Sequence, residues 1–408
     1  MNSPATQTLS TDLGAIRGTG PVLRTMRRFL RHLDRGSLRL TLPDGAVIDH
    51  AGTEPGPHGE LVLHRWRALR RLIARGDLGF AEGYMAGDWS SPDLPRLIAI
   101  CAVNLDRLDS LIDGSLPVRI MRRLAHMLRG NSKQGSRRNI AAHYDLGNAF
   151  YRPWLDAGMT YSAALAPHAG ESLESAQDRK LARIAELLGP IEGRRMLEIG
   201  CGWGTLAMHL ARRGAQVTGL TLSREQLAHG QAMIAAAGLD DRVALELTDY
   251  RDATGKYDGI VSIEMIEAVG EAWWPTYFRT VHDRLVPGGR AVIQAITIAE
   301  DRFEHYRIAP DFIQHYIFPG GMLPTRTIIA EQARAAGLVP VACELFAQGY
   351  VATLAEWRRR FAAARDTLTG LGFDAAFQRM WTYYLAYCEA GFATGQTDVG
   401  LYVFERSA

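Results

Sequence analysis

The chain has 408 residues, of which 47% are hydrophobic and 22% are charged, with a formal net charge of +2. This length exceeds the usual size of a single hydrophobic core, so two domains are expected. The ordinary composition and nearly balanced charge argue against a disordered chain and against a strongly basic nucleic-acid-binding protein.

The first hundred residues read as a small folded domain. The N-terminus lacks a charged start followed by an apolar core, so we expect no signal peptide. "SLRLTLPDGAVIDHAG" predicts a hairpin around Pro43-Asp44-Gly45, and "HRWRALRRLIARG" predicts a helix that ends at Gly76. The apolar run "LPRLIAICAVNL" is too short to span a bilayer. These patterns predict an N-terminal α+β domain over residues 1–118.

A basic segment follows over residues 119–140. "RIMRRLAHMLRGNSKQGSRR" contains seven Lys and Arg residues and no acid, and its Gly and Ser residues interrupt the helical pattern. Two interpretations stay open: a solvated linker, or a segment attracted to an anionic membrane surface, where each basic residue contributes about 1 kcal/mol.

Strands and helices alternate after residue 140. The strands are expected at Arg195–Gly200, Gln216–Leu222, Val243–Leu247, Tyr257–Ile263, Arg290–Thr297, Leu338–Leu345 and Val399–Glu405. Such alternation is typical of a parallel sheet with helices on both faces, and a strand after the last helix suits an antiparallel edge. The sequence therefore predicts an α/β catalytic domain over residues 141–408 with a Rossmann-like sheet.

The loop "LEIGCGWGTL" has the spacing G-x-G-x-G at the end of a predicted strand. A nicotinamide-binding loop has G-x-G-x-x-G and an acid at the end of the next strand, where this chain has Thr221 and Ser223. Glu198 before the loop and Asp249-Tyr250 after the third strand fit S-adenosylmethionine (SAM) better. Ser223 and Gln226 also form a capping box, which leaves helix-terminal N–H groups near the cofactor ribose. The expected fold is a class I SAM-dependent methyltransferase.

Longer motifs indicate the methyl acceptor. In order, "HYDLGNAFY", "MTYS", "LEIGCGWG", "LTLSREQ", "VSIEMIEAVG" and "YIFPGGMLPT" resemble the cyclopropane-fatty-acyl-phospholipid synthase and mycolic acid cyclopropane synthase family. The resemblance covers roughly residues 138–405, and "GDLGFAEGYMAGDWSSPDL" is similar to the N-terminal domain of the phospholipid-acting members. It implies an enzyme whose cofactor is SAM and whose substrate is an unsaturated phospholipid acyl chain, located in the cytoplasm and peripherally on the membrane.

The resemblance also implies a site. The acyl double bond attacks the SAM methyl group, and a base then removes a proton from the resulting cation; in this family the base is a bound bicarbonate. Carried over, the groups around the bicarbonate are Glu267, Tyr350, Gln294 and backbone groups of Ile296 and Ala163. The implied cofactor contacts are Tyr161, Ser162, Gly200, Cys201, Gly202, Thr221, Leu222, Ser223, Arg224, Glu225, Gln226, Tyr250 and Arg251.

Three positions depart from the family pattern. Ala163 replaces a cysteine, Ala268 replaces a histidine, and Gln294 replaces the histidine that binds bicarbonate. Glutamine can donate a hydrogen bond to an anion but cannot carry charge or shuttle a proton. The substitution therefore favours methylation without ring closure, which leaves a methyl-branched, still unsaturated chain.

Several alternatives stay open. The same fold would suit a small-molecule or RNA methyltransferase, and a protein that lost chemistry with its histidine would be a catalytically impaired lipid-binding homologue. Glu267 could be a structural carboxylate, and Glu264 has no assigned role beyond binding the cofactor or capping a helix. "WRRRF" at Trp357–Phe361 is expected to form an exposed helix face. The four scattered cysteines predict reduced thiols and no metal site, no nucleic-acid partner is expected, and a homo-oligomer is allowed.

Overall fold

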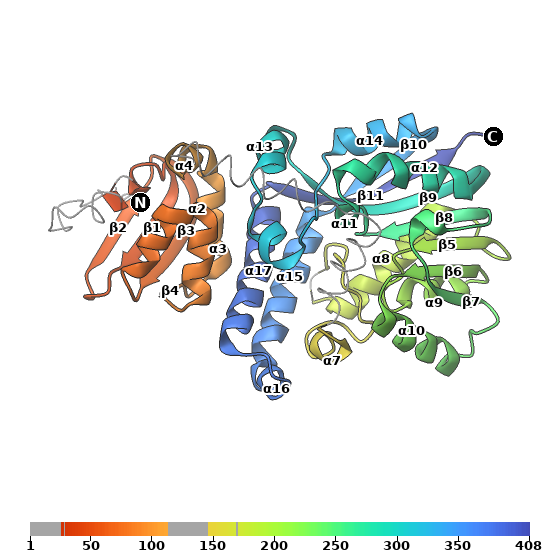
Figure 1. Ribbon diagram of the computed structural model, residues 1–408, viewed down its shortest axis with the longest axis horizontal. Helices are drawn as coiled ribbons and strands as arrows, with labels where there is room; N and C mark the ends of the chain where they lie inside the picture. The colour runs from red at the N-terminus through yellow and green to blue at the C-terminus, as the bar shows by residue number, and fades with distance from the viewer. Residues whose placement is uncertain (1–25, 28, 113–145, 169) are drawn as a thin grey trace, which may run out of the picture. The chain divides into compact units, whose positions relative to one another are not determined.

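The computed structural model describes residues 26–27, 29–112, 146–168 and 170–408. The chain divides into two compact units (Figure 1). The described part of the first unit contains residues 26–112 and Phe373–Thr394, and that of the second contains residues 146–372 and Gly395–Ala408. The predicted basic segment 119–140 and the first residues of "HYDLGNAFY" lie outside the described residues.

The first unit is a four-stranded sheet covered by helices. Its strands are β1 (Arg35–Thr41), β2 (Val47–Ala51), β3 (Glu54–Leu63) and β4 (Trp89–Ser90), in the order β2-β1-β3-β4. Its helices are α2 (Arg67–Met85), α3 (Leu94–Val103), α4 (Leu105–Ile112) and α17 (Ala375–Ala393).

The predicted hairpin and helix are both present, with one difference. Strands β1 and β2 pair antiparallel, and the Gly45 N–H donates to the Leu42 carbonyl at 2.9 Å to close the turn. The helix predicted to end at Gly76 breaks there, with φ 60°, but a second helical stretch continues α2 to Met85. Glycine permits this break because positive φ costs it little.

Helix α17 belongs to the first unit, although the predicted boundary places it in the domain 141–408. It packs on α2 and α3, where Tyr383 lies 5.8 Å from Tyr84 between ring centroids and the Arg379 Nε–H donates to the Met85 carbonyl at 2.8 Å. The aromatic residues Trp381, Tyr383 and Tyr384 of this helix are buried in the core of the unit. The first unit is thus completed by α17, which begins at Ala375, far beyond the end of α4 at Ile112. The boundary between the two units therefore could not be found from proximity in the sequence.

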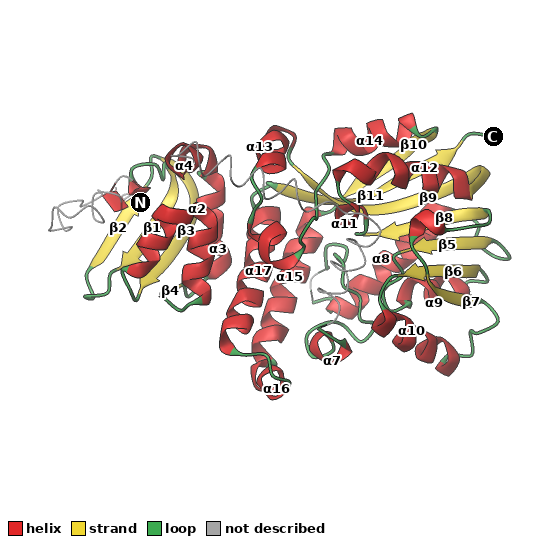
Figure 2. Ribbon diagram, in the orientation of Figure 1, coloured by secondary structure: helices red, strands yellow, loops and turns green. Residues whose placement is uncertain are grey.

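The second unit is built on a seven-stranded sheet with the order β10-β11-β9-β8-β5-β6-β7 (Figure 2). The strands are β5 (Arg195–Ile199), β6 (Gln216–Thr221), β7 (Val243–Leu247), β8 (Tyr257–Ile263), β9 (Leu285–Ile298), β10 (Leu338–Leu345) and β11 (Thr397–Arg406). The helices are α7 (Asn148–Tyr151), α8 (Leu173–Leu188), α9 (Thr205–Ala211), α10 (Arg224–Ala236), α11 (Ile266–Val269), α12 (Trp274–Arg284), α13 (Phe303–Ile308), α14 (Arg326–Ala335), α15 (Ala347–Ala363) and α16 (Arg365–Gly370). Short 3₁₀ turns lie at Tyr250–Asp252, Glu271–Trp273 and Glu300–Arg302, and a π turn lies at Ile313–Ile317.

The predicted strands are all present, but the C-terminal strand is not the edge. Strands β5 to β9 run parallel, whereas β11 pairs antiparallel with both β9 and β10, so β10 forms the edge. The reason is burial: Leu401 and Val403 on one face and Tyr402 and Phe404 on the other are all 5% exposed or less. A strand apolar on both faces belongs inside a sheet.

Helices cover both faces of this sheet, and the strand residues alternate between the two cores. Leu197 and Ile293 point to the side of α12 and α14, whereas Met196 and Val292 point to the side of α8 and α9. This period of two, with both faces buried, explains the near-continuous apolar strands. Within the described ranges, no helix is long and apolar enough to cross a membrane, and no group of three potential metal ligands occurs.

Candidate active site

The glycine loop follows β5 at the carboxyl edge of the parallel strands, where ligands bind in open α/β sheets. Gly200, Gly202 and Gly204 have φ of 82°, 52° and 87°. The loop is fastened to the neighbouring strand, because the Gly200 and Cys201 N–H groups both donate to the Leu220 carbonyl, at 3.0 and 2.8 Å. Glycine is required here by conformation, since other residues rarely adopt positive φ.

The segment after β6 is held by side chains as well as by the sheet. The Gln226 N–H donates to Ser223 Oγ at 3.2 Å, which confirms half of the predicted capping box. The other half differs: the Ser223 N–H donates to Thr221 Oγ1 at 3.1 Å, and Thr221 Oγ1 donates to Gln226 Oε1 at 2.9 Å. Arg224 and Glu225, which lie between Ser223 and Gln226 in the sequence, are exposed.

The segment after β7 contains a buried ion pair between Arg251 and Asp249. Asp249 accepts from the Arg251 guanidinium at 2.8 and 2.7 Å, and the guanidinium carbon lies 4.7 Å from the Trp273 ring centroid. Burial raises the pKa of the adjacent Tyr250 to about 12, so its hydroxyl stays protonated. We call the glycine loop, Thr221–Gln226 and Asp249–Arg251 the cofactor edge.

The cofactor edge fits SAM. A Cβ added at Gly202 would meet no atom within 4 Å, so the chain leaves room beside this backbone. Burial raises the pKa of Glu198 at the end of β5 to about 8, and its Oε2 has no hydrogen-bond partner among the described residues. An orphaned buried oxygen beside a roomy loop is suited to a polar ligand.

A second group of side chains lies at the ends of β8 and β9, beside the segment that precedes α8. That segment is shaped by Asp156, whose carboxylate accepts from the Gly158 and Thr160 N–H groups at 2.9 and 2.8 Å. Further along, the buried Lys180 of α8 donates to Ser162 Oγ at 2.7 Å. Burial lowers the pKa of Lys180 to about 8, against the attraction of Glu264 and Asp156.

Glu264 is the centre of this group. Its Oε1 accepts from the Ala163 N–H at 2.8 Å and from Gln294 Nε2 at 2.7 Å. Its Oε2 accepts from the Tyr350 hydroxyl at 2.8 Å. One carboxylate thus joins the segment before α8, strand β9 and helix α15.

Glu267 lies one helical turn further along, at α11, and differs from Glu264 in its partners. Its Oε1 accepts from the Ile296 N–H at 2.5 Å, and its buried Oε2 has no hydrogen-bond partner among the described residues. Burial, and secondarily the nearby Glu264, raises the pKa of Glu267 to about 8. Glu267 is therefore mostly protonated at neutral pH. We call Ala163, Glu264, Glu267, Gln294, Ile296 and Tyr350 the carboxylate cluster.

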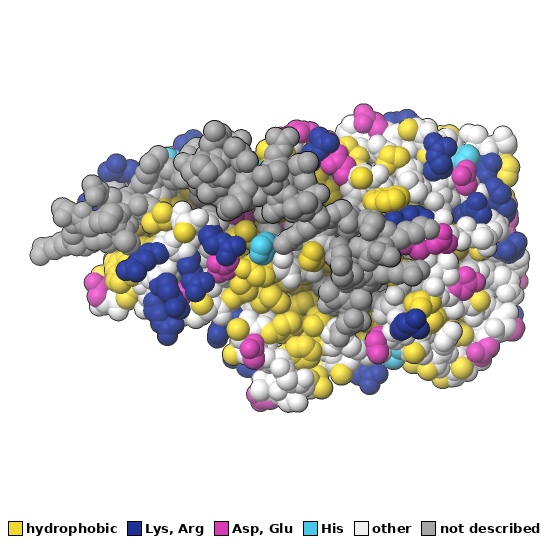
Figure 3. All heavy atoms as spheres, viewed as in Figure 1, with side chains coloured by type: hydrophobic (Ala, Val, Ile, Leu, Met, Phe, Trp, Pro, Cys, Tyr) yellow, Lys and Arg dark blue, Asp and Glu magenta, His cyan; other side chains and the backbone are white. Residues whose placement is uncertain are grey.

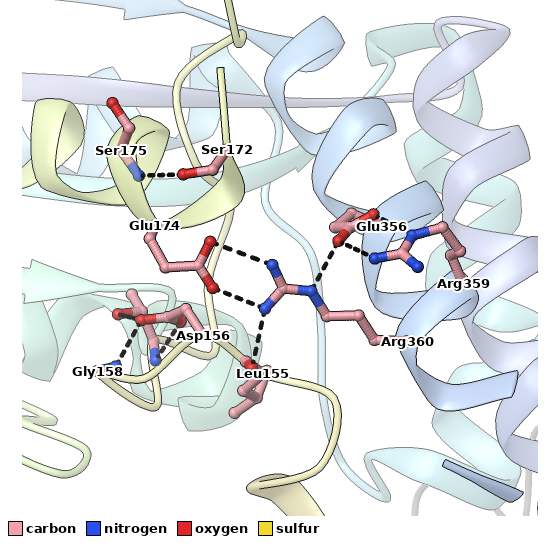
Figure 4. A network of polar contacts seen from close by, with 10 residues as sticks. Leu155, Asp156, Gly158, Ser172, Glu174, Ser175, Glu356, Arg359 and Arg360 are labelled. Atoms are coloured by element: carbon pink, nitrogen blue, oxygen red, sulfur yellow. Dashed lines mark hydrogen bonds and ion pairs between the residues drawn. The ribbon is translucent and has the colours of Figure 1, made fainter. Parts of the chain in front are cut away.

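Helix α15 brings Tyr350 to the cluster because it approaches the segment before α8 very closely. A Cβ at Gly349 would lie 2.3 Å from the Ala164 carbonyl oxygen, and the Ala164 N–H donates to Thr353 Oγ1 at 3.0 Å. Figure 4 shows the anchor of the same helix: Arg360 points at Glu174 of α8 with both of its terminal nitrogens, at 2.8 and 3.1 Å, and at the Leu155 carbonyl. Such a bidentate pair fixes direction as well as distance.

Aromatic rings in contact with one another run from the cofactor edge to the carboxylate cluster. Tyr161 lies 5.3 Å from Trp357 and 5.4 Å from Tyr151 between centroids, and Tyr151 lies 5.4 Å from Trp203 in the glycine loop. Trp357 in turn lies 6.1 Å from Tyr350. The negative faces of such rings tolerate a cation nearby.

The structure brings the predicted residues together in two groups. Gln294, Ile296, Ala163 and Tyr350 converge as the family resemblance implies, but three of the four contact Glu264 and only Ile296 contacts Glu267. Sequence reasoning assigned Glu264 no role, although it directly follows a predicted strand at the ligand-binding edge. The expectation that "WRRRF" is exposed is wrong for its ends, since Trp357 and Phe361 are 0% and 3% exposed.

Comparison with known proteins adds relatives over most of the chain. The family model described as mycolic acid cyclopropane synthetase matches residues 131–401. The chain is 42% identical over 389 residues to "Tuberculostearic acid methyltransferase UfaA1" of Mycobacterium tuberculosis, covering 92% of this chain and 88% of that protein. It is 34% identical over 351 residues to "Cyclopropane-fatty-acyl-phospholipid synthase" of Escherichia coli, covering 83% and 85%.

Solved structures of methyltransferases share the fold. A mycolic acid cyclopropane synthase complexed with SAH and CTAB matches with a TM-score of 0.62 at 29% identity, covering 66% of this chain and 98% of that one. A coclaurine N-methyltransferase bound to SAH matches with a TM-score of 0.61 at 17% identity, covering 81% and 98%, which concerns the fold alone.

Proposed function

The chain belongs to the mycolic acid cyclopropane synthetase family of SAM-dependent enzymes that act on lipid acyl chains, and from this premise we propose that it methylates the double bond of a phospholipid acyl chain without closing a ring. The product is a methyl-branched chain that keeps one double bond. The phospholipid that carries the acyl chain and the unringed product both go beyond what the family membership shows.

SAM supplies an electrophilic methyl group, which the π electrons of the acyl double bond take to form a new carbon–carbon bond. The residues of the cofactor edge bind SAM: the open backbone at Gly202 gives it room, and Thr221–Gln226 offer polar groups after β6. Tyr161 and Trp357 belong to the run of ring contacts between the glycine loop and Tyr350, and we assign to these rings the stabilisation of the positive charge left on the acyl chain. We place the loss of a proton from the acyl-chain cation, which removes that positive charge, at the carboxylate cluster.

Gln294 is the observation that carries the product assignment. The resemblance places the proton-shuttling histidine of ring-closing enzymes at this position. Here the Gln294 side chain is fully buried, and its amide nitrogen donates to Glu264 Oε1 at 2.7 Å and to the Ala163 carbonyl at 3.3 Å. An amide held in this way cannot accept or pass on a proton. The 42% identical relative named a methyltransferase, rather than a synthase of cyclopropanes, supports the same product.

Phospholipid as the substrate carrier is supported by the match to the phospholipid synthase over both units. Basic side chains gather on the face of the first unit that Figure 3 shows. Arg65 and Arg67 are 61% and 53% exposed even though both reach the buried Asp88. Exposed guanidinium groups favour peripheral binding to anionic lipid headgroups.

The test is the fatty acid profile of a bacterial host that lacks its own cyclopropane synthase and expresses this protein. We expect fatty acids heavier by one CH2 that retain an olefinic proton signal and gain a branching methyl group. The same mass gain with upfield cyclopropane protons would instead show that the chain closes a ring with Gln294 in place. No mass gain would favour a small-molecule methyltransferase or a catalytically impaired lipid-binding homologue.

A further inference from the structure

The groups that the family resemblance assigns to bicarbonate are already engaged by the chain's own carboxylates. Ala163, Gln294 and Tyr350 each donate a hydrogen bond to Glu264, and the Ile296 N–H donates to Glu267. An anion that needed these same donors would have to displace both side chains. The residues present therefore do not fit a bound bicarbonate.

Backbone geometry shows that the position of Glu264 is built into the fold. Among the residues that the structure describes, Glu264 and Met159 are the two other than glycine with positive φ, at 48° and 56°. Glu264 also donates its N–H to the Gln294 carbonyl at 2.8 Å, so backbone and side chain both meet Gln294. Such strained conformations persist at sites where the surroundings enforce them.

The carboxyl groups of Glu264 and Glu267 have different surroundings, which favour different protonation states. Glu264 accepts three hydrogen bonds and lies near the buried Lys180 ammonium, and these interactions oppose the rise in its pKa that burial causes. Glu267 has one donor and a bare Oε2, so its pKa is about 8. The three donors to Glu264 and the nearby Lys180 favour its ionised form, whereas Glu267, with a pKa of about 8, is mostly the neutral acid at pH 7.

We propose that Glu264 is the base of this enzyme and that the reaction uses no bicarbonate. The inference rests on the proposed function for the identity of the substrate. A C–H bond next to the cationic carbon of the methylated acyl chain breaks, its electron pair forms the new carbon–carbon double bond, and its proton moves to a carboxylate oxygen of Glu264. The proton then passes to solvent, which regenerates the carboxylate. Gln294, Tyr350 and the Ala163 N–H are positioning groups, because they act through Glu264.

The first experiment measures turnover of the purified full chain with SAM and vesicles of monounsaturated phosphatidylglycerol and phosphatidylethanolamine. We expect the wild-type rate to stay within twofold between CO2-free buffer and added bicarbonate. Glu264→Gly keeps the strained φ without cost and should lower the rate by about 100-fold or more. Added formate or bicarbonate should restore part of that loss in Glu264→Gly but none in Glu264→Gln, which fills the space. A wild-type rate that rises several-fold with bicarbonate would overturn the proposal.

A second readout does not depend on activity. ¹³C-labelled bicarbonate is mixed with each apoprotein, and binding is followed by the broadening of its ¹³C signal. We expect broadening with Glu264→Gly and none with the wild type or Glu264→Gln. Stoichiometric binding to the wild type would refute Glu264 as the occupant of this site. Failure of every lipid to react would count against the proposed substrate, while the binding result would still decide the assignment of Glu264.

Discussion

The cofactor edge and the carboxylate cluster lie at the same end of the same sheet but are built in opposite ways. The cofactor edge is made largely by backbone: a loop of three positive-φ glycines tied to the Leu220 carbonyl, and a helix start capped by Ser223. The carboxylate cluster is made by side chains from three separate parts of the chain and the Ala163 N–H from a fourth, which meet at Glu264. Backbone geometry is encoded locally, whereas a cluster of distant side chains is encoded only by the fold.

This difference predicts that the two regions respond differently to substitution. The cofactor edge is formed by three short segments, each of which is a local motif of the sequence. The cluster changes its chemistry through single side chains, as at Gln294, whose amide supports Glu264 where a histidine would offer a titrating group. We therefore expect substitutions at the two regions to affect different measured quantities.

The largest effect is expected from Gly202→Val at the cofactor edge. Valine would fill the open space beside the loop and would be strained at a φ of 52°. We expect the affinity for SAM, measured by isothermal titration calorimetry, to fall by about 100-fold or more. Gly238→Val is the matched control, since Gly238 also has open surroundings and a φ of 63° but lies after α10. Equal SAM affinity in the two variants would remove Gly202 from the cofactor site.

A smaller effect, confined to turnover, is expected from Tyr350→Phe in the carboxylate cluster. The variant loses the hydroxyl that donates to Glu264 Oε2 at 2.8 Å, so the pKa of Glu264 should rise. Hydrogen bonds to charged groups contribute about 1.5–3 kcal/mol, which corresponds to roughly a tenfold to hundredfold lower rate at neutral pH. The acid limb of the kcat/KM profile should move to higher pH, with SAM affinity unchanged.

The control for that variant is Tyr383→Phe, which removes a buried tyrosine hydroxyl from the first unit. A shift of the pH profile in both variants, or in neither, would contradict the assignment of Tyr350 as a positioning residue. A loss of SAM affinity in Tyr350→Phe would show that the two regions are not separable.

A third prediction concerns stability against pH, and it tests the neutral state of Glu267. The folded-state pKa of about 8 lies above the ordinary value of 4.5, so the folded chain binds this proton more tightly than the unfolded chain. The stabilisation is fully present below pH 4.5 and is lost as the pH rises toward 8. Relative to Glu267→Gln, the wild-type free energy of unfolding should fall by up to about 1.4 kcal/mol per pH unit in this interval.

Urea unfolding of the apoproteins at pH 5, 6, 7 and 8 measures this difference. Glu246→Gln serves as the control, because Glu246 is an exposed glutamate on β7. A difference between wild type and Glu267→Gln that stays constant with pH would mean that Glu267 is ionised throughout. The two carboxyl groups would then share one charge state, and the contrast with Glu264 would be lost.

The sequence predicted the second unit well because its signals are local. Every strand from β5 to β11 was expected within a few residues, apart from the earlier start of β9, since apolar runs punctuated by glycine mark buried strands. The position of β11 inside the sheet and the packing of α17 in the first unit were not predicted. Both depend on which distant surfaces meet, and local periodicity carries no information about that.

The same limit explains the candidate site. Gly200, Gly202 and Ser223 could be found because the motif and the function occupy the same few residues. Glu264 was passed over because its partners Ala163 and Tyr350 lie 101 and 86 residues away. Its location directly after β8 was the available signal, but of the two glutamates in "VSIEMIEAVG" the family resemblance carries a role over only to Glu267.

The smallest effect is expected where the cluster is held from a distance, at Arg360. Its guanidinium bonds to both oxygens of Glu174 and to Glu356 at 2.7 Å, and so ties α15 to α8 (Figure 4). Lysine cannot reproduce this fork, so Arg360→Lys should shift Tyr350 slightly and lower turnover a few-fold without changing SAM affinity.

Arg359→Lys is the matched control for this last variant, because Arg359 is 68% exposed and pairs only with Glu356 among the contacts described for it. Exposed pairs of this kind contribute about 0–1 kcal/mol, so its turnover and melting temperature should stay near those of the wild type. Equal behaviour of the two variants would mean that α15 is held by packing at Gly349 and Thr353 alone. A turnover loss in Arg360→Lys only would show that the carboxylate cluster, unlike the cofactor edge, depends on contacts far from its own residues.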